Sequence, residues 1–166
     1  MMKKIIIFVV LIFVQSTILF SQSYIDFETE DINGNEIKLS SYVDKGPVMI
    51  GFWRSWCPSC KEEQKNMQIL FEKYKDKGFS YIGVNIDNQK SVSKVKSYVS
   101  AMEFTFPVIL DTDKKIFEMY GGSEDAVPYY LMIGKDKKIF STHLGYKTGD
   151  EKMIEEEVNE ALEITK

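Results

Sequence analysis

The two cysteines of Cys57-Pro58-Ser59-Cys60 constrain this chain more than any other feature of its sequence, and the chain has no other cysteine. They directly follow an apolar run at residues 48–53 and directly precede a helical pattern. Two thiols at the first turn of a helix can close a small disulfide and open it again. The sequence therefore predicts a buried strand, a redox-active pair and a helix in immediate succession.

The N-terminus predicts export. Lys3 and Lys4 are followed by an unbroken apolar run at residues 5–14 and, further on, by small polar residues. This order is typical of a secretory signal peptide, which we place at residues 1–22, before one domain at residues 23–166. An uncleaved signal anchor is the alternative, although the apolar stretch is shorter than the roughly 20 residues that a membrane-spanning helix needs. We expect the protein in the periplasm or elsewhere in the cell envelope.

Export bears on the role of the cysteines, because secreted domains mostly use cysteines as structural crosslinks. Here a crosslink would enclose only two residues, so it would remove little chain entropy and add little stability. A closed zinc site needs four ligands, whereas the chain offers two cysteines and one histidine, His143. We therefore expect a reactive pair, with no metal and no bound cofactor.

Length and charge set wider limits. The 166 residues are 44% hydrophobic, which suffices for one domain with a real core. The formal net charge of −4 argues against non-specific nucleic-acid binding. Nothing in the sequence requires an oligomer, and we expect a monomer.

The patterning along the chain predicts an α/β sandwich with a mixed sheet. Residues 24–42 alternate around Asn33-Gly34, which indicates a β-hairpin. Strands are expected at residues 48–53, 79–86, 107–110, 129–133 and 139–146. Helices are expected from Cys57 to a stop at Gly78, at residues 91–102 with Ser91 as N-cap, at residues 114–120, and from Thr148 with Glu151 in a capping box.

The position of Cys57 predicts a division of labour between the two thiols. At a helix start, unpaired backbone N–H groups and the positive end of the helix dipole favour its thiolate, the form that attacks disulfides. Pro58 fits the first turn, where its missing N–H is not needed. Cys60 lies one turn further and is expected to be more buried. We predict that Cys57 attacks a partner disulfide and that Cys60 resolves the mixed disulfide.

Three further residues are candidates for the site. Glu63 lies three residues after Cys60, where its carboxylate could accept the proton of that thiol; alternatively it only favours the helix dipole. Trp56 abuts the nucleophile and is expected to shield it and to form part of the substrate surface. Pro128 precedes an apolar strand, which from the residues alone predicts an edge position.

From about Phe27 onward the chain resembles the exported thioredoxin-fold oxidoreductases of the TlpA/ResA type. The segment FWRSWCPSC at residues 52–60 is similar to their Phe-Trp-x-x-Trp-Cys-x-x-Cys element, and Glu63 stands where many members carry glutamate. Val127-Pro128 resembles their cis-proline element, which packs against the disulfide and offers backbone groups to an extended substrate. The resemblance implies catalytic Cys57, Cys60 and Glu63, and a substrate surface that we assign to Trp56, Pro58, Val127 and Pro128.

The resemblance also implies a fold: a thioredoxin-like sandwich with a central mixed β-sheet flanked by helices. The hairpin around Asn33-Gly34 is similar to the family's N-terminal extension, and residues 87–115 to its helix-containing insertion. Two positions depart from related proteins. Gly51 stands where thioredoxin carries a buried aspartate, and Tyr129 follows Pro128 where the family usually has threonine, which bears on proton transfer and on the substrate groove.

The leading functional hypothesis is an exported protein-disulfide reductase supplied with electrons by a membrane thiol–disulfide carrier. Candidate substrates are apocytochrome c and other exported proteins. A copper-delivery protein of the Sco type, using the two cysteines and His143, is the second hypothesis, although that group has three residues between its cysteines. A peroxidase of the peroxiredoxin type, with Arg54 beside the nucleophile, is the third.

Overall fold

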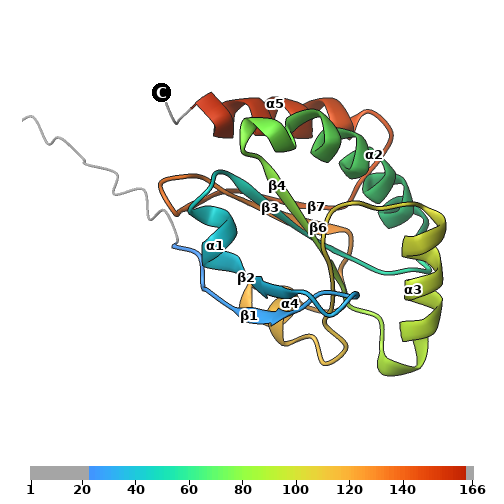
Figure 1. Ribbon diagram of the computed structural model, residues 1–166. Helices are drawn as coiled ribbons and strands as arrows, with labels where there is room; N and C mark the ends of the chain where they lie inside the picture. Colours follow the sequence, from blue (N-terminus) through green and yellow to red (C-terminus); the bar gives the residue numbers. More distant parts are fainter. Residues whose placement is uncertain (1–22, 164–166) are drawn as a thin grey trace, which may run out of the picture.

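A five-stranded mixed sheet organises the computed structural model, which describes residues 23–163 (Figure 1). The strands occur in the order β5-β4-β3-β6-β7 across the sheet. Strands β3, β4 and β5 run parallel, whereas β6 is antiparallel to β3 and β7 is antiparallel to β6. The strand bounds are Val48–Trp53 for β3, Ser80–Asn85 for β4, Val108–Leu110 for β5, Tyr129–Ile133 for β6 and Ile139–Leu144 for β7.

The position of the central strand β3 explains why its sequence is continuously apolar. All six of its residues are buried, because β4 and β6 pair with its two edges and helices cover both faces of the sheet. A strand in this position reads as a continuous apolar run rather than an alternating one. Its carboxyl end leads directly into the cysteine pair, so the most rigid part of the sheet positions the reactive segment.

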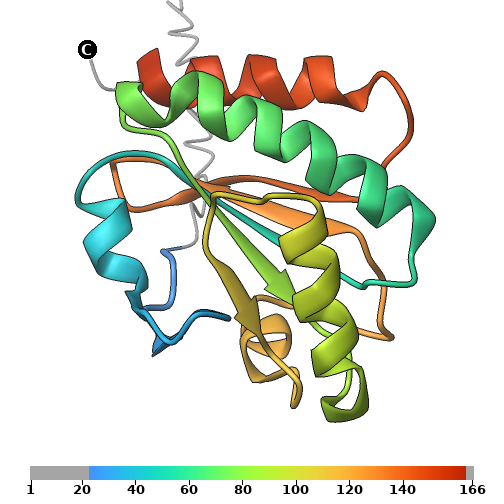
Figure 2. The same ribbon diagram turned by 45° about the vertical axis from the view of Figure 1, so that its right-hand side comes forward.

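Helices and a hairpin form the outer layers. One face of the sheet packs against α2 (Pro58–Tyr74), α3 (Val92–Ala101) and α5 (Asp150–Glu163). The other face packs against α1 (Leu39–Val43), α4 (Lys115–Met119) and the hairpin of β1 (Glu28–Glu30) and β2 (Glu36–Lys38). Figures 1 and 2 show α2 and α5 side by side over the sheet, with α1 and the hairpin below it. The predicted thioredoxin-like sandwich with its N-terminal hairpin is confirmed.

The predicted insertion at residues 87–115 contains a helix, as expected. A 3₁₀ turn, η2 (Gln89–Ser91), leads into α3, and a second one, η1 (Lys75–Lys77), follows α2. The segment also supplies β5, which pairs with β4 as the edge strand of the sheet. The insertion therefore completes the sheet as well as covering it.

Three local predictions are wrong. Residues 39–43, expected as the end of the hairpin, form α1, because Leu39 and Val43 lie one turn apart and both enter the core. The Ser91 side chain does not cap α3; Asn88 instead accepts the Lys90 N–H at 3.0 Å in the preceding turn η2.

The predicted capping box at α5 is also absent in its expected form. The Thr148 hydroxyl donates to Glu62 Oε1 at 2.8 Å rather than capping the helix. Glu151 accepts the N–H of Gly149, the residue before α5, at 2.7 Å. Glu151 therefore accepts a backbone N–H at the helix start as predicted, but that of Gly149 rather than that of Thr148.

The predicted signal peptide at residues 1–22 lies outside the described residues. Within residues 23–163, no helix combines the length and the apolar character that crossing a bilayer requires.

Candidate active site

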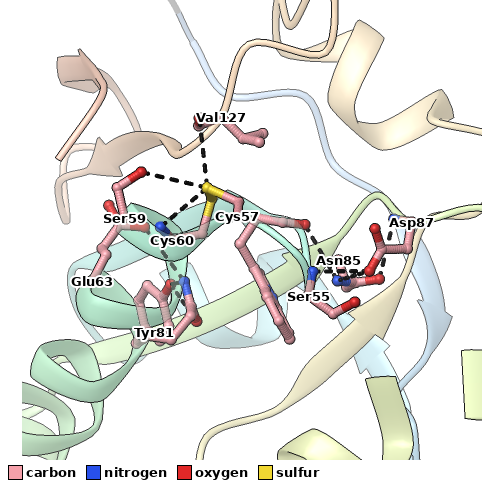
Figure 3. Close-up of a disulfide and its surroundings, with 11 residues drawn as sticks. Ser55, Cys57, Ser59, Cys60, Glu63, Tyr81, Asn85, Asp87 and Val127 are labelled. Atoms are coloured by element: carbon pink, nitrogen blue, oxygen red, sulfur yellow. Dashed lines mark hydrogen bonds between the residues drawn. A yellow bond between two sulfur atoms is a disulfide. The ribbon is translucent and has the colours of Figure 1, made fainter. Parts of the chain in front are cut away.

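Cys57 and Cys60 form a disulfide at the N-terminus of α2 (Figure 3). Cys57 is the N-cap of the helix, and its Sγ accepts the Cys60 N–H at 3.2 Å. Because a disulfide sulfur has no proton, the Ser59 hydroxyl, 3.4 Å away, donates to the same Sγ. After the disulfide opens, both donors and the helix dipole would stabilise a thiolate on Cys57.

The two sulfurs differ in accessibility. Cys57 is 6% exposed, and Cys60 is 0% exposed. A partner molecule therefore reaches Cys57 first, which is the order that the predicted roles of attacking and resolving thiol require. Pro58 occupies the first helical position, as predicted.

The Val127–Pro128 peptide bond is cis, and Val127 lies beside the disulfide (Figure 3). The carbonyl oxygen of Val127 is 4.0 Å from Cys57 Sγ. Pro128 directly precedes β6, which lies between β3 and β7. The edge position expected from the residues alone is therefore wrong, and the cis-proline element implied by the resemblance is confirmed.

The four predicted substrate-surface residues differ in exposure. Trp56 is 58% exposed, and Pro58 is also exposed. Val127 is half-buried and Pro128 is buried. Trp56, Pro58 and Val127 are therefore the side chains near Cys57 that a docking protein can contact, whereas Pro128 is covered by the fold.

Glu63 is fully buried on the inward face of α2. Burial raises the pKa of its carboxyl group to about 8, with a smaller opposing effect from the Gln64 amide, which donates to Oε2 at 3.4 Å. Its other oxygen, Oε1, has no hydrogen-bond partner among the described residues. A surface glutamate that only favours the helix dipole would be solvated, so this environment favours the proton-transfer interpretation, which stays a prediction.

A tyrosine occupies the space beside Gly51, the position that corresponds to the aspartate of thioredoxin. A Cβ atom on Gly51 would lie 2.2 Å from the Tyr81 hydroxyl oxygen. That hydroxyl forms hydrogen bonds with the Gln64 side chain, 2.8 Å from Nε2 and 3.0 Å from Oε1. Burial, and then the nearby Glu63 carboxylate, raise the pKa of Tyr81 well above its usual range. Tyr81 and Gln64 therefore form a neutral, buried hydrogen-bonded pair beside Gly51.

A second buried network fixes the segment between β3 and the cysteines (Figure 3). Asp87 Oδ2 accepts the Ser55 N–H at 2.9 Å. The Asn85 side-chain amide donates to the Trp53 carbonyl oxygen and to Asp87 Oδ2, each at 3.3 Å. Asn85 and Asp87 were not among the predicted site residues; polar residues at the end of an otherwise apolar buried strand were the available signal.

The two alternative hypotheses gain no support from the geometry. The described residues contain no group of three or more His, Cys, Asp or Glu side chains arranged to hold a metal ion. His143 instead stacks on Tyr130, with ring centroids 5.4 Å apart, and lies 4.0 Å from an Asp150 carboxylate oxygen. Arg54, which a peroxidase would direct at the nucleophile, is ion-paired with Asp125 at 2.5 Å.

Comparisons with known proteins show which family this chain belongs to. Residues 21–141 match the AhpC/TSA family. The thiol-disulfide oxidoreductase ResA of Bacillus anthracis is 32% identical over 126 residues, which are 76% of this chain and 70% of that protein. ResA of Bacillus subtilis (strain 168) is 32% identical over 134 residues, or 81% of this chain and 71% of that protein.

A solved structure extends the similarity to the fold. It is a Chlorobium tepidum protein named as a thiol:disulfide interchange protein DsbE, and it superposes with a TM-score of 0.77. The two chains are 26% identical, and the match covers 86% of this chain and 96% of the other.

Proposed function

Since the chain belongs to the AhpC/TSA family, within which it is a thiol–disulfide oxidoreductase of the ResA type, we propose that it reduces disulfides of other exported proteins. One observation carries this proposal: a disulfide at a helix N-terminus whose first cysteine is slightly exposed and whose second is completely buried. Export is supported by the pattern of residues 1–22.

In the proposed reaction the reduced protein supplies two electrons to a substrate disulfide. The Cys57 thiolate attacks one substrate sulfur, a mixed disulfide forms, and the other substrate sulfur leaves as a thiolate. Cys60 then attacks Cys57 Sγ, which breaks the mixed disulfide and releases the second substrate thiolate. The substrate ends as a dithiol, and the protein ends with the Cys57–Cys60 disulfide.

Glu63 is the proposed proton carrier for the buried thiol. Cys60 must lose its proton in order to attack, and solvent does not reach it. In the proposed step an ionised Glu63 carboxylate of the reduced protein takes up that proton, and the pKa of about 8 that burial gives Glu63 in the oxidised protein keeps the proton there at neutral pH. When an electron donor reopens the disulfide, the same group returns the proton to Cys60.

The direction of the reaction requires an electron donor. In an oxidising compartment the pair returns to the dithiol only if another protein reduces it. We propose a membrane thiol–disulfide carrier, which would approach the same face, because Cys57 is the more exposed sulfur. The face around Trp56 and Val127 would then receive donor and substrate in turn.

Single-turnover kinetics and redox equilibration test the proposal. The reduced protein should reduce insulin; Cys57→Ser should abolish the reaction, and Cys60→Ser should accumulate the mixed disulfide. Equilibration of the pair with glutathione or dithiothreitol buffers should give a potential near the about −270 mV of thioredoxin or below. A value near about −120 mV would make the protein a disulfide donor instead. Peroxide consumption by the reduced protein would favour the peroxidase hypothesis.

A further inference from the structure

We propose that the ion pair between Arg54 and Asp125 is a clamp that fixes the substrate surface around Cys57, which makes Asp125 a positioning residue for protein substrates. The inference rests on the proposed reduction of protein disulfides. It concerns how the protein recognises a large partner, because neither residue is a participant in the thiol chemistry described above.

The ion pair joins the two segments that flank the nucleophile. Arg54 directly follows β3, three residues before Cys57, and Asp125 lies two residues before Val127 in the segment between α4 and β6. Arg54 Nη2 is 2.5 Å from Asp125 Oδ1. Trp56 belongs to the first segment and Val127 to the second, so the pair crosslinks both sides of the proposed docking surface.

The environment of Arg54 makes Asp125 its necessary partner. The Arg54 side chain is only 13% exposed, and its Nε has no hydrogen-bond partner among the described residues. A guanidinium group so far removed from water needs an anion, because removing the partner would leave an uncompensated charge. The Asp125 side chain is 42% exposed, so its carboxylate lies on the solvent side of the guanidinium group.

A second cation keeps Asp125 in its charged form. Lys114, which precedes α4, donates to the same Oδ1. The hydrogen bond from Lys114, followed by the interaction with Arg54, lowers the pKa of Asp125. The clamp is therefore intact at neutral and mildly acidic pH.

The clamp reaches the docking surface through Trp56. The guanidinium carbon of Arg54 lies 5.2 Å from the centroid of the Trp56 ring, within the range of a cation–π interaction. Asp125 holds Arg54, and Arg54 supports the ring that stands exposed beside Cys57. A change at Asp125 therefore alters the surface that an incoming protein meets.

The backbone around Asp125 adds a second reason for the clamp. Glu124 and Asp125 have φ angles of 51° and 58°, in the left-handed region that non-glycine residues rarely adopt and that costs energy. The side-chain ties of Asp125 to Arg54 and Lys114 compensate for this strain. Without them the segment would relax, and the part of the docking surface formed by the Val127 side chain, two residues further, would lose its fixed shape.

Substitutions at Asp125 test the clamp by comparing a large and a small disulfide. The reduced protein carrying Asp125→Asn should reduce insulin about fivefold more slowly than wild type, the loss expected for one partly exposed ion pair. It should reduce the small disulfide DTNB at the wild-type rate and keep the wild-type reduction potential. Asp125→Glu should restore most of the insulin rate. Glu124→Gln is the matched control, because Glu124 forms no ion pair among the described residues.

The outcomes separate this inference from the proposed function. Equal rates for wild type and Asp125→Asn on insulin, or equal losses on both substrates, would overturn the clamp while leaving the reductase intact. If the wild type reduces DTNB but not insulin, the proposed function fails, and the clamp fails with it. Should Asp125→Asn not fold, Arg54→Lys provides the second test: it keeps the charge but replaces the planar guanidinium group that lies over Trp56, and it should lose insulin reduction selectively.

Discussion

At the scale of single residues, burial changes the chemistry of Glu63. A carboxyl group in water ionises well below neutral pH, but this one lies wholly inside the protein on α2. Ionisation there would leave a charge without water and with only one weak donor, Gln64. The protonated form is therefore favoured until about pH 8. The unfavourable ionisation of Glu63 also makes the free energy of unfolding depend on pH. It can therefore be measured without a substrate.

We predict that the oxidised protein loses stability as pH rises between about 4.5 and 8, the ordinary and the folded pKa of Glu63. In this window the unfolded chain releases the proton while the folded protein retains it. The stabilising effect is complete below the unfolded pKa and falls by up to about 1.4 kcal/mol per pH unit. Glu63→Gln should remove this slope, as urea unfolding of the oxidised protein at several pH values would show.

The neighbouring glutamate provides the control. Glu62 lies on the same helix, is only partly buried and accepts from Thr148, so Glu62→Gln should keep the wild-type pH dependence. Parallel curves for wild type and Glu63→Gln would mean that Glu63 is ionised in the fold, and its proposed role as proton carrier would be lost.

At the scale of elements, two glycines are register partners in neighbouring strands, but their surroundings differ. Gly51 in β3 pairs with Gly83 in β4. A Cβ on Gly51 would lie 2.2 Å from the Tyr81 hydroxyl oxygen and 2.9 Å from its Cζ. A Cβ on Gly83 would meet nothing nearer than 3.1 Å, a ring carbon of Phe106. The strand sequence therefore leaves room for the Tyr81 ring by omitting a side chain at Gly51.

We predict that Gly51→Ala destabilises the protein by about 1–3 kcal/mol, because the buried Tyr81 ring must move out of its packed position. Gly83→Ala is the matched substitution in the adjacent strand, and a shift of a few tenths of an ångström should accommodate it at a smaller cost. Urea unfolding of both variants, in the same redox state, gives the comparison. Equal destabilisation would show that the Tyr81 ring moves freely and is not fixed beside Gly51.

Tyr81 also shows why part of the site could not be predicted. Its sequence position indicates a strand, but its contact with Gly51 depends on how β4 pairs with β3, and the contact with Gln64 depends on the rotation of α2. Neither is a local pattern. The ion pair of Asp125 is harder still to predict, because its partner Arg54 lies far away in sequence and the loop that contains Asp125 has an unusual backbone.

At the scale of the whole molecule, the predictable features are those encoded by short-range patterns. The strands and the long helices follow from apolar periodicity and turn residues, and the cysteine pair with Glu63 follows from helix geometry. Helix α1 was not predictable, because five residues are too few to show a period; burial of Leu39 and Val43 against the sheet stabilises it. The cis form of Pro128 required the family resemblance, since the residues alone favoured an edge strand.

The disulfide links the chemistry of the site to the stability of the entire fold. The difference in unfolding free energy between the oxidised and reduced protein equals the difference in reduction potential between the folded and unfolded pair, at about 1.4 kcal/mol per 30 mV. Chain entropy contributes little, because the loop encloses only two residues. The difference in unfolding free energy therefore reports whether the folded environment stabilises the disulfide or the two free cysteines.

Two features of the fold oppose each other in that comparison. The Cys60 N–H and the Ser59 hydroxyl would stabilise a Cys57 thiolate, which favours the reduced form. The complete burial of Cys60 would deprive a free thiol of contact with water, which the disulfide does not need, and so favours the disulfide. A reductase requires the second effect to be larger.

We therefore predict that the oxidised protein unfolds at a higher urea concentration than the reduced protein. Both forms are to be unfolded at pH 7, with and without dithiothreitol, and the double variant Cys57→Ser/Cys60→Ser, which cannot form the bond, should be insensitive to the reductant. A reduced form more stable than the oxidised one would show that the thiolate dominates. The pair would then pass its disulfide to partners, and the direction proposed here would reverse while the fold and the attacking role of Cys57 stayed the same.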